Sequence, residues 1–196
     1  MFVSHDLQVR HREEVYDAGH TRMTTHEAAE LIRSAVTGHE GLWADLGAGS
    51  GIFTRALVEI LGPTARVYAV DRDPGALAGL ARWAKKKAPG VITLAADFTR
   101  PLGLPALDGM LFANALHFVE DAPGALARLA AHVRPGGRVV VVEYDGRGPN
   151  RWVPYPIPAG RWPELARAAG LTVPAVRARR PSAFGGDLYV ATAEHL

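Results

Sequence analysis

The sequence predicts an α/β fold, with a seven-stranded, mostly parallel sheet, helices on both faces and an antiparallel hairpin at the C-terminus. Short apolar runs typical of buried strands alternate with segments whose apolar residues recur at helical spacing. The last two predicted strands are joined by the short connection 184–187, with no helix between them. A length of 196 residues suits one domain with a substantial core.

The individual elements are predicted from Thr24 onward. Thr24 and Glu27 resemble a capping box at the start of the first helix, and Asp73 with Pro74 forms a typical helix start further on. Strands are expected at 42–44, 66–70, 91–95, 109–113, 139–143, 171–178 and 188–193. Helices are expected at 24–36, 52–61, 74–88, 122–133 and 162–169. Residues 24–196 would form the core of a single domain (1–196), preceded by a polar segment, 1–23, without clear periodicity.

A glycine-rich turn, Asp45 to Gly51, lies between the first strand and the next helix. In such a turn, main-chain N–H groups and a helix N-terminus can meet a polar ligand. A dinucleotide fingerprint would need its third glycine at position 52, but Ile52 stands there and the glycine is at 51. The spacing therefore disfavours a nicotinamide-dependent dehydrogenase.

The spacing Gly47-x-Gly49-x-Gly51 resembles the first motif of the class I S-adenosylmethionine (SAM) dependent methyltransferases, which have a Rossmann-like fold. Further landmarks of that family follow in the same order within residues 42–145. These landmarks are Asp71 after the second strand, Asp97-Phe98 after the third, the segment 114–121 after the fourth, and the turn 134–138 before the fifth.

The resemblance implies that SAM is the cofactor and S-adenosylhomocysteine (SAH) the product. In this family the glycine turn lies against the methionine part, the acidic residue after strand two accepts hydrogen bonds from the ribose, and the one after strand three binds the adenine amino group. The cofactor-binding residues expected on this basis are Asp45, Gly47, Ala48, Gly49, Gly51, Asp71, Arg72, Asp97, Phe98 and Asn114.

The acceptor pocket is expected over the carboxyl ends of strands four and five. His117 is the candidate catalytic residue, because a histidine titrates near neutral pH and can take a proton from a hydroxyl or amine. The alternative is a histidine that packs or hydrogen-bonds locally at a helix start. Trp152 and Tyr155 of the proline-rich loop 146–160, and Tyr16 and His20 of a lid-like segment 1–23, are expected to bind the acceptor.

Composition excludes several other kinds of chemistry. The chain is 48% hydrophobic and 21% charged, which is typical of a globular protein. It contains no cysteine, so disulfides, thiolate metal sites and a thiolate nucleophile are excluded. Its 8 histidines show no metal-ligand spacing, so no metal is expected. A net charge of +2 does not indicate a nucleic-acid partner.

These observations predict a SAM-dependent methyltransferase that acts on a small-molecule acceptor. An RNA or protein methyltransferase is one alternative, although the tetrad Asn114-Ala115-Leu116-His117 differs from the Asp/Asn-Pro-Pro-aromatic motif of amino-directed nucleic-acid enzymes. A SAM-binding module without activity is another. With no apolar leader and no membrane-length apolar run, a cytoplasmic enzyme without a membrane partner is expected, and a homodimer is compatible with this prediction.

Overall fold

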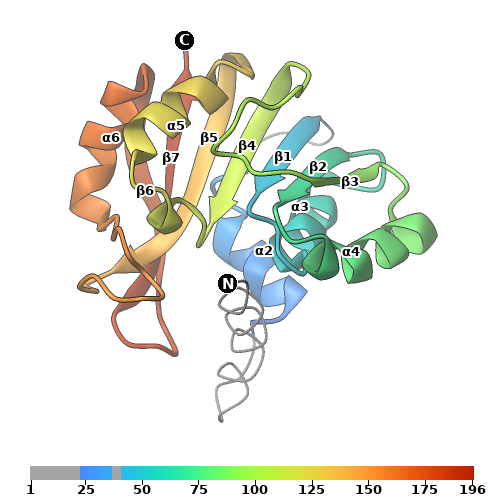
Figure 1. The fold of residues 1–196 in the computed structure, drawn as a ribbon, viewed down its shortest axis with the longest axis horizontal. Coiled ribbons are helices and arrows are strands. Elements are labelled where there is room, and N and C mark those ends of the chain that lie inside the picture. Colours follow the sequence, from blue (N-terminus) through green and yellow to red (C-terminus); the bar gives the residue numbers. More distant parts are fainter. Residues whose placement is uncertain (1–22, 37–40) are drawn as a thin grey trace, which may run out of the picture.

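A single seven-stranded sheet forms the centre of the computed structural model, which describes residues 23–36 and 41–196. The strands lie in the order β3-β2-β1-β4-β5-β7-β6 (Figure 1). Their bounds are β1 Leu42–Leu46, β2 Arg66–Asp71, β3 Val91–Ala95, β4 Leu107–Ala113, β5 Val133–Asp145, β6 Leu171–Pro181 and β7 Asp187–His195. The helices are α2 Thr25–Ile32, α3 Ile52–Leu61, α4 Pro74–Lys87, α5 Ala122–Ala130 and α6 Trp162–Ala168, with short 3₁₀ turns η2 Leu116–Phe118 and η3 Ala159–Arg161.

Strand pairing confirms the predicted sheet. Strands β1 to β5 pair in parallel, and β7 is antiparallel to both of its neighbours, β5 and β6. The first strand, β1, lies in the middle of the sheet, the next two strands extend outward to β3, and the chain then crosses to β4 on the other side of β1. The carboxyl ends of β1 and β4 therefore flank the point where the winding direction reverses, which is where open α/β sheets bind their ligands.

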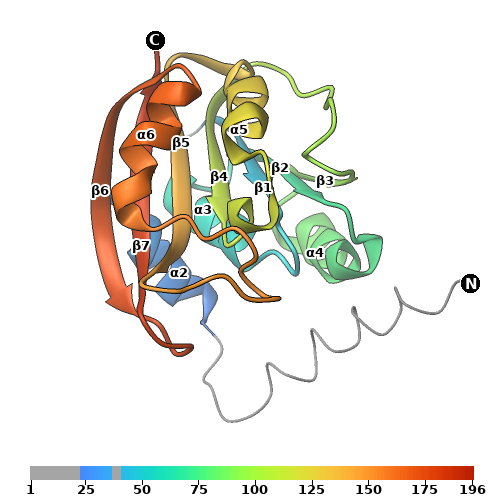
Figure 2. The same cartoon turned by 60° about the vertical axis from the view of Figure 1, so that its left-hand side comes forward.

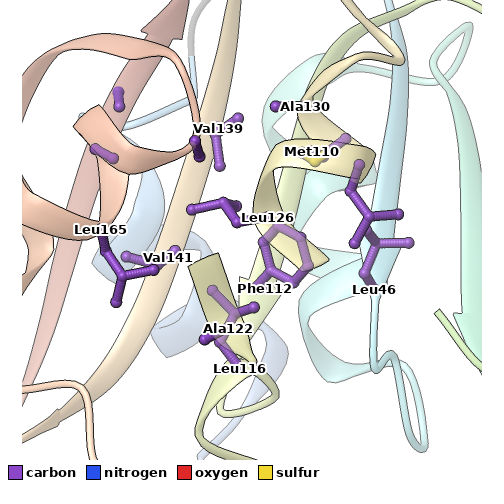
Figure 3. Close-up of a cluster of buried hydrophobic side chains, with 14 of the residues drawn as sticks. Leu46, Met110, Phe112, Leu116, Ala122, Leu126, Ala130, Val139, Val141 and Leu165 are labelled. Carbon is purple, nitrogen blue, oxygen red and sulfur yellow. The ribbon is translucent and has the colours of Figure 1, made fainter. Parts of the chain in front are cut away.

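Helices cover both faces of the sheet, as predicted (Figure 2). On one face α5 and α6 pack against β4 and β5, and Figure 3 shows Phe112, Leu126, Val141 and Leu165 meeting there. On the other face α2, α3 and α4 bury a second cluster around Trp43 of β1. Both clusters consist of fully buried aliphatic and aromatic side chains, so each helix is held to the sheet by burial of apolar surface.

The largest differences between the predicted and the observed boundaries are at the end of α2 and the start of β5. Helix α2 ends at Ile32, because the next turn closes through N–H groups of Ala35 and Val36 that both donate to the carbonyl of Ile32. Strand β5 begins at Val133, earlier than predicted, and the expected turn 134–138 is a bulge within it. The pairing moves there from Leu107↔Val133 to Gly109↔Arg138.

Candidate functional site

The glycine turn between β1 and α3 lies across the end of β2. The N–H groups of Gly47 and Ala48 donate to the carbonyl oxygen of Val70 at 2.8 and 3.0 Å. Gly47, Gly49 and Gly51 all have positive φ, of +84°, +53° and +84°. This left-handed conformation favours glycine, so the spacing found in the sequence reflects the path of the backbone.

The three glycines differ in what surrounds them. A Cβ atom on Gly47 would lie 2.6 Å from Cβ of Ala115, and one on Gly51 would lie 2.5 Å from Cδ1 of Leu80 on α4. A Cβ atom on Gly49 would meet no atom within 4 Å among the described residues. Gly47 and Gly51 are thus required by close packing, whereas Gly49 faces open space in which a ligand can approach the main chain.

Asp71 at the end of β2 connects this turn to the start of α4. One carboxylate oxygen accepts a hydrogen bond from the N–H of Gly49 at 2.7 Å, and the other accepts one from the N–H of Asp73 at 2.9 Å. Asp73 caps α4 through the N–H groups of Gly75 and Ala76. The carboxylate of Asp71 therefore lies directly beside the open position at Gly49.

Asp45 lies beneath the turn, fully buried. Its Oδ2 accepts a hydrogen bond from Oγ1 of Thr54 in the first turn of α3 at 2.6 Å, and its Oδ1 has no partner among the described residues. Burial raises the pKa of Asp45 to about 7, with a smaller contribution from the charge of Asp71 and against the effect of the Thr54 hydrogen bond. Asp45 holds α3 to β1.

The segment after β3, which contains Asp97 and Phe98, lies beside Gly47 of the glycine turn. The half-buried ring of Phe98 packs edge-on against Phe112, with centroids 5.8 Å apart, and its Cε1 is 3.6 Å from where a Cβ on Gly47 would be. Oδ1 of Asp97 accepts hydrogen bonds from the N–H and Oγ1 of Thr99 at 2.9 and 2.7 Å. Partial burial raises the pKa of Asp97, but the Thr99 hydrogen bonds and the charges of Arg72 and Arg100 outweigh it, so the pKa is lowered.

Asn114, directly after β4, has an unusual conformation. Its φ is +52°, and the side-chain Oδ1 is buried without a hydrogen-bond partner among the described residues. Its N–H donates to the carbonyl of Val142 on β5 at 2.8 Å. Residues other than glycine adopt positive φ rarely, and such conformations concentrate at functional sites.

His117 in η2 forms a buried pair with Glu143 at the end of β5. Nδ1 lies 2.6 Å from Oε2 of Glu143, and the main-chain N–H of His117 donates to Oε1 of the same carboxylate at 3.2 Å. His117 is 2% exposed and Glu143 is 1% exposed. When Nδ1–H donates a hydrogen bond to the carboxylate, the free lone pair of the imidazole is on Nε2. No described residue donates a hydrogen bond to Nε2. Glu143 was not among the predicted site residues. A single carboxylate that follows four valines of a buried strand could have indicated a site residue.

Aromatic side chains surround this pair. The ring centroids of Phe118 and Tyr144 lie 4.3 and 6.0 Å from that of His117. The N–H of Tyr155 donates to the carbonyl of His117 at 3.0 Å, so the proline-rich loop lies against η2, below the end of β4 (Figure 2). Trp152 belongs to the same loop, with the guanidinium of Arg151 4.6 Å from its ring centroid.

The structure thus brings most of the predicted site residues to one edge of the sheet. Tyr16 and His20 lie outside the described residues. Within the ranges 23–36 and 41–196 no group of acidic or histidine side chains could hold a metal ion. No helix in the same ranges is long and apolar enough to cross a membrane.

The fold and the glycine turn define a class of protein, the SAM-dependent methyltransferases with a Rossmann-like sheet and an antiparallel seventh strand. A family model described as "Methyltransferase domain" matches residues 44–141, and the chain belongs to that family. No curated protein matches the chain in sequence.

Solved structures agree with this assignment. A Burkholderia thailandensis 1,6-didemethyltoxoflavin N1-methyltransferase, solved with its substrate and SAH, is 25% identical, with a TM-score of 0.72 over 95% of this chain and 83% of that one. An O-methyltransferase of neocarzinostatin biosynthesis, solved with SAM and 2-hydroxy-5-methyl naphthoic acid, is also 25% identical, with a TM-score of 0.65 over 97% of this chain and 56% of that one. A SAM-dependent methyltransferase from Aquifex aeolicus shares the fold at 16% identity, with a TM-score of 0.69 over 87% of this chain and 90% of that one. This chain is therefore a SAM-dependent methyltransferase.

Proposed function

We propose that this enzyme methylates a small-molecule acceptor and that His117 removes the acceptor's proton. The observation that carries the proposal is the buried contact between His117 and Glu143, beside the glycine turn and at the carboxyl ends of β4 and β5. A buried carboxylate that fixes one imidazole nitrogen leaves the other oriented as an acceptor of protons.

The residues of the glycine turn fit the proposed cofactor site. Gly49 faces open space, the carboxylate of Asp71 lies beside it, and an unpartnered amide oxygen on Asn114 lies at the end of the neighbouring strand. Asp71 would hold the ribose, Gly47 to Gly49 the methionine part, and Asp97 and Phe98 the adenine, with Arg72 at the rim. SAM supplies a methyl group that is already electrophilic, so the protein has to align the acceptor, remove its proton and exclude water.

Asp45 has a different proposed role from the other cofactor residues. Its carboxylate is fully buried and hydrogen-bonded to Thr54, so we propose that it supports the glycine turn from below rather than contacting the cofactor. A fixed turn reduces the ordering cost of binding.

A small-molecule acceptor is supported by the site and by the neighbours. The rings of Phe118 and Tyr144 lie next to the ring of His117, and the main chain of Tyr155 hydrogen-bonds its carbonyl. The two 25% identical neighbours were solved with small ring compounds, 1,6-didemethyltoxoflavin and 2-hydroxy-5-methyl naphthoic acid. The predicted lid, residues 1–23, and its acceptor contacts Tyr16 and His20 stay predictions. An RNA or protein acceptor and a SAM-binding module without activity are outcomes of the test below.

The test is SAH production by the purified enzyme with SAM and a panel of phenols, amines, carboxylic acids, tRNA and peptides. At least one small molecule should be methylated. His117→Asn should lower kcat about a hundredfold, the lower range of general base catalysis, with SAH affinity unchanged within about twofold. His132→Asn is the matched control, because the His132 side chain hydrogen-bonds only the carbonyl of Leu104 among the described residues and should be dispensable for activity.

Turnover of tRNA or a peptide alone would contradict the small-molecule proposal. Tight SAH binding without turnover of any class would favour the inactive binding module. Full activity of His117→Asn with the best acceptor would remove His117 from the mechanism.

A further inference from the structure

Arg147, near the proposed acceptor site, differs from Arg179 and Arg180 in its partners. Arg179 pairs with the carboxylate of Asp145, and Arg180 lies 3.6 Å from that of Glu27. Arg147 is half-buried and has no carboxylate within 4.0 Å among the described residues. Its guanidinium instead lies 4.8 Å from the ring centroid of Tyr144 and donates a hydrogen bond to the carbonyl of Phe184. The stacked guanidinium is thus held in place while its charge is not neutralised by a described side chain.

This guanidinium is close to the proposed base. The ring centroid of Tyr144 is 6.0 Å from that of His117, and the Cζ atom of Arg147 is 4.8 Å from that of Tyr144. The guanidinium and the imidazole are therefore separated by at most the sum of these two distances, a span comparable with the length of a small bicyclic aromatic acid. A planar guanidinium recognises a carboxylate through two parallel hydrogen bonds.

Aromatic residues next to His117 favour a flat ligand. Phe118 and Tyr155, which contact His117, are 37% and 38% exposed. Aromatic rings bind planar ligands by stacking and edge-to-face contact, with little loss of side-chain freedom. Two acidic side chains of β5, Glu143 and Asp145, are already paired with His117 and Arg179.

We propose that the acceptor is a planar aromatic hydroxy acid whose carboxylate binds Arg147 and whose ring packs beside Phe118, Tyr144 and Tyr155. This inference rests on the proposed function. The acceptor's hydroxyl proton passes to Nε2 of His117. The acceptor oxygen bonds to the methyl carbon as the carbon–sulfur bond of the cofactor breaks, and the bonding electron pair stays on sulfur. The products are an aromatic methyl ether and SAH.

The test compares two probes that share a ring system and a hydroxyl group, 3-hydroxy-2-naphthoic acid and 2-naphthol, by calorimetry on the SAH-loaded protein. The wild type should bind the acid at least about tenfold more tightly, as expected for a hydrogen bond between charged groups. Arg147→Gln should abolish that preference and leave 2-naphthol affinity within about twofold. Arg167→Gln on α6 is the matched control and should retain the preference.

Equal binding of both probes by the wild type, or an unchanged preference in a folded Arg147→Gln variant, would overturn the inference. If Arg147→Gln does not fold, Arg147→Lys replaces it and should keep only part of the preference, because an ammonium lacks the planar pair of donors. Binding of SAH without binding of either probe would overturn the inference of an aromatic hydroxy acid as acceptor and leave the proposed function intact. Failure to bind SAH would overturn the proposed function together with it.

Discussion

Nδ1 of His117 and Oε2 of Glu143 lie 2.6 Å apart, and the two residues are almost completely buried at the ends of adjacent elements. The same carboxylate also accepts the main-chain N–H of His117, so it controls both the position of η2 and the orientation of the ring. Glu143 is therefore proposed as a positioning residue for the base.

Glu143→Gln tests this role. The neutral amide no longer stabilises a protonated imidazole, so kcat should fall at least about tenfold while KM for the acceptor stays within about twofold. SAH affinity should stay within about twofold. Glu120→Gln, at an exposed position, is the control. A rise in KM for the acceptor with kcat unchanged would indicate a purely structural role.

Gly49 and Gly51 should respond differently to alanine. Gly51→Ala combines left-handed strain with a collision against Leu80, so we expect a loss of about 3 kcal/mol in unfolding free energy. Gly49→Ala has only the strain, about 1–2 kcal/mol, but places a methyl group in the open space where the cofactor is proposed to lie. Urea unfolding and SAH calorimetry measure the two effects. If Gly49→Ala kept full SAH affinity, the cofactor would not approach that position.

Asp71→Ala should weaken SAH binding by about 1.5–3 kcal/mol, because the carboxylate lies beside the open position and also holds the N–H of Gly49. Asp73→Ala is a matched control on the same loop. It removes the N-cap of α4, which should lower stability by about 1 kcal/mol without changing SAH affinity. Equal effects of both substitutions on SAH affinity would contradict the assignment of Asp71 to the ribose.

Asp45 should make the stability of the protein depend on pH. Its pKa is about 7 in the folded protein and near 3.8 when exposed, so unfolding releases a proton between these values. Raising the pH from 4 to 7 therefore favours the unfolded state, and the penalty is complete above pH 7. Asp45→Asn, which has no proton to release, should show a smaller decline of the unfolding free energy in urea titrations between pH 4.5 and 7.5. Parallel declines in both proteins would contradict the raised pKa.

Val173→Gly should stabilise the protein by about 1 kcal/mol. Val173 has a φ of +47° at a bulge of the edge strand β6 and is 63% exposed, so glycine relieves strain and loses little packing. Val176→Gly on the same strand is the control and should destabilise, because Val176 pairs with Ala191 and its φ is not positive. Thermal unfolding of both variants checks the opposite signs.

Local patterns in the sequence were sufficient for much of this structure. Helical spacing predicted α3 and α4, Thr24 with Glu27 predicted the capping box, and the glycine spacing predicted the turn between β1 and α3. These features depend on residues that are close in sequence. Patterns failed at the start of β5, where the segment 134–137 is a typical turn sequence. Pairing of Val133 with Leu107 on a neighbouring strand extends the sheet past it.

The sequence by itself determined the alternation of strands and helices, the family motifs and the residues able to serve a methyltransferase. Only the tertiary structure decided that Glu143 holds His117, that Arg147 lies on Tyr144, and that Asp45 is buried under the turn while Gly49 is open. The physical reason is that these contacts join separate elements. Which side chains meet depends on strand order, register and the direction each residue faces, and no local pattern encodes these.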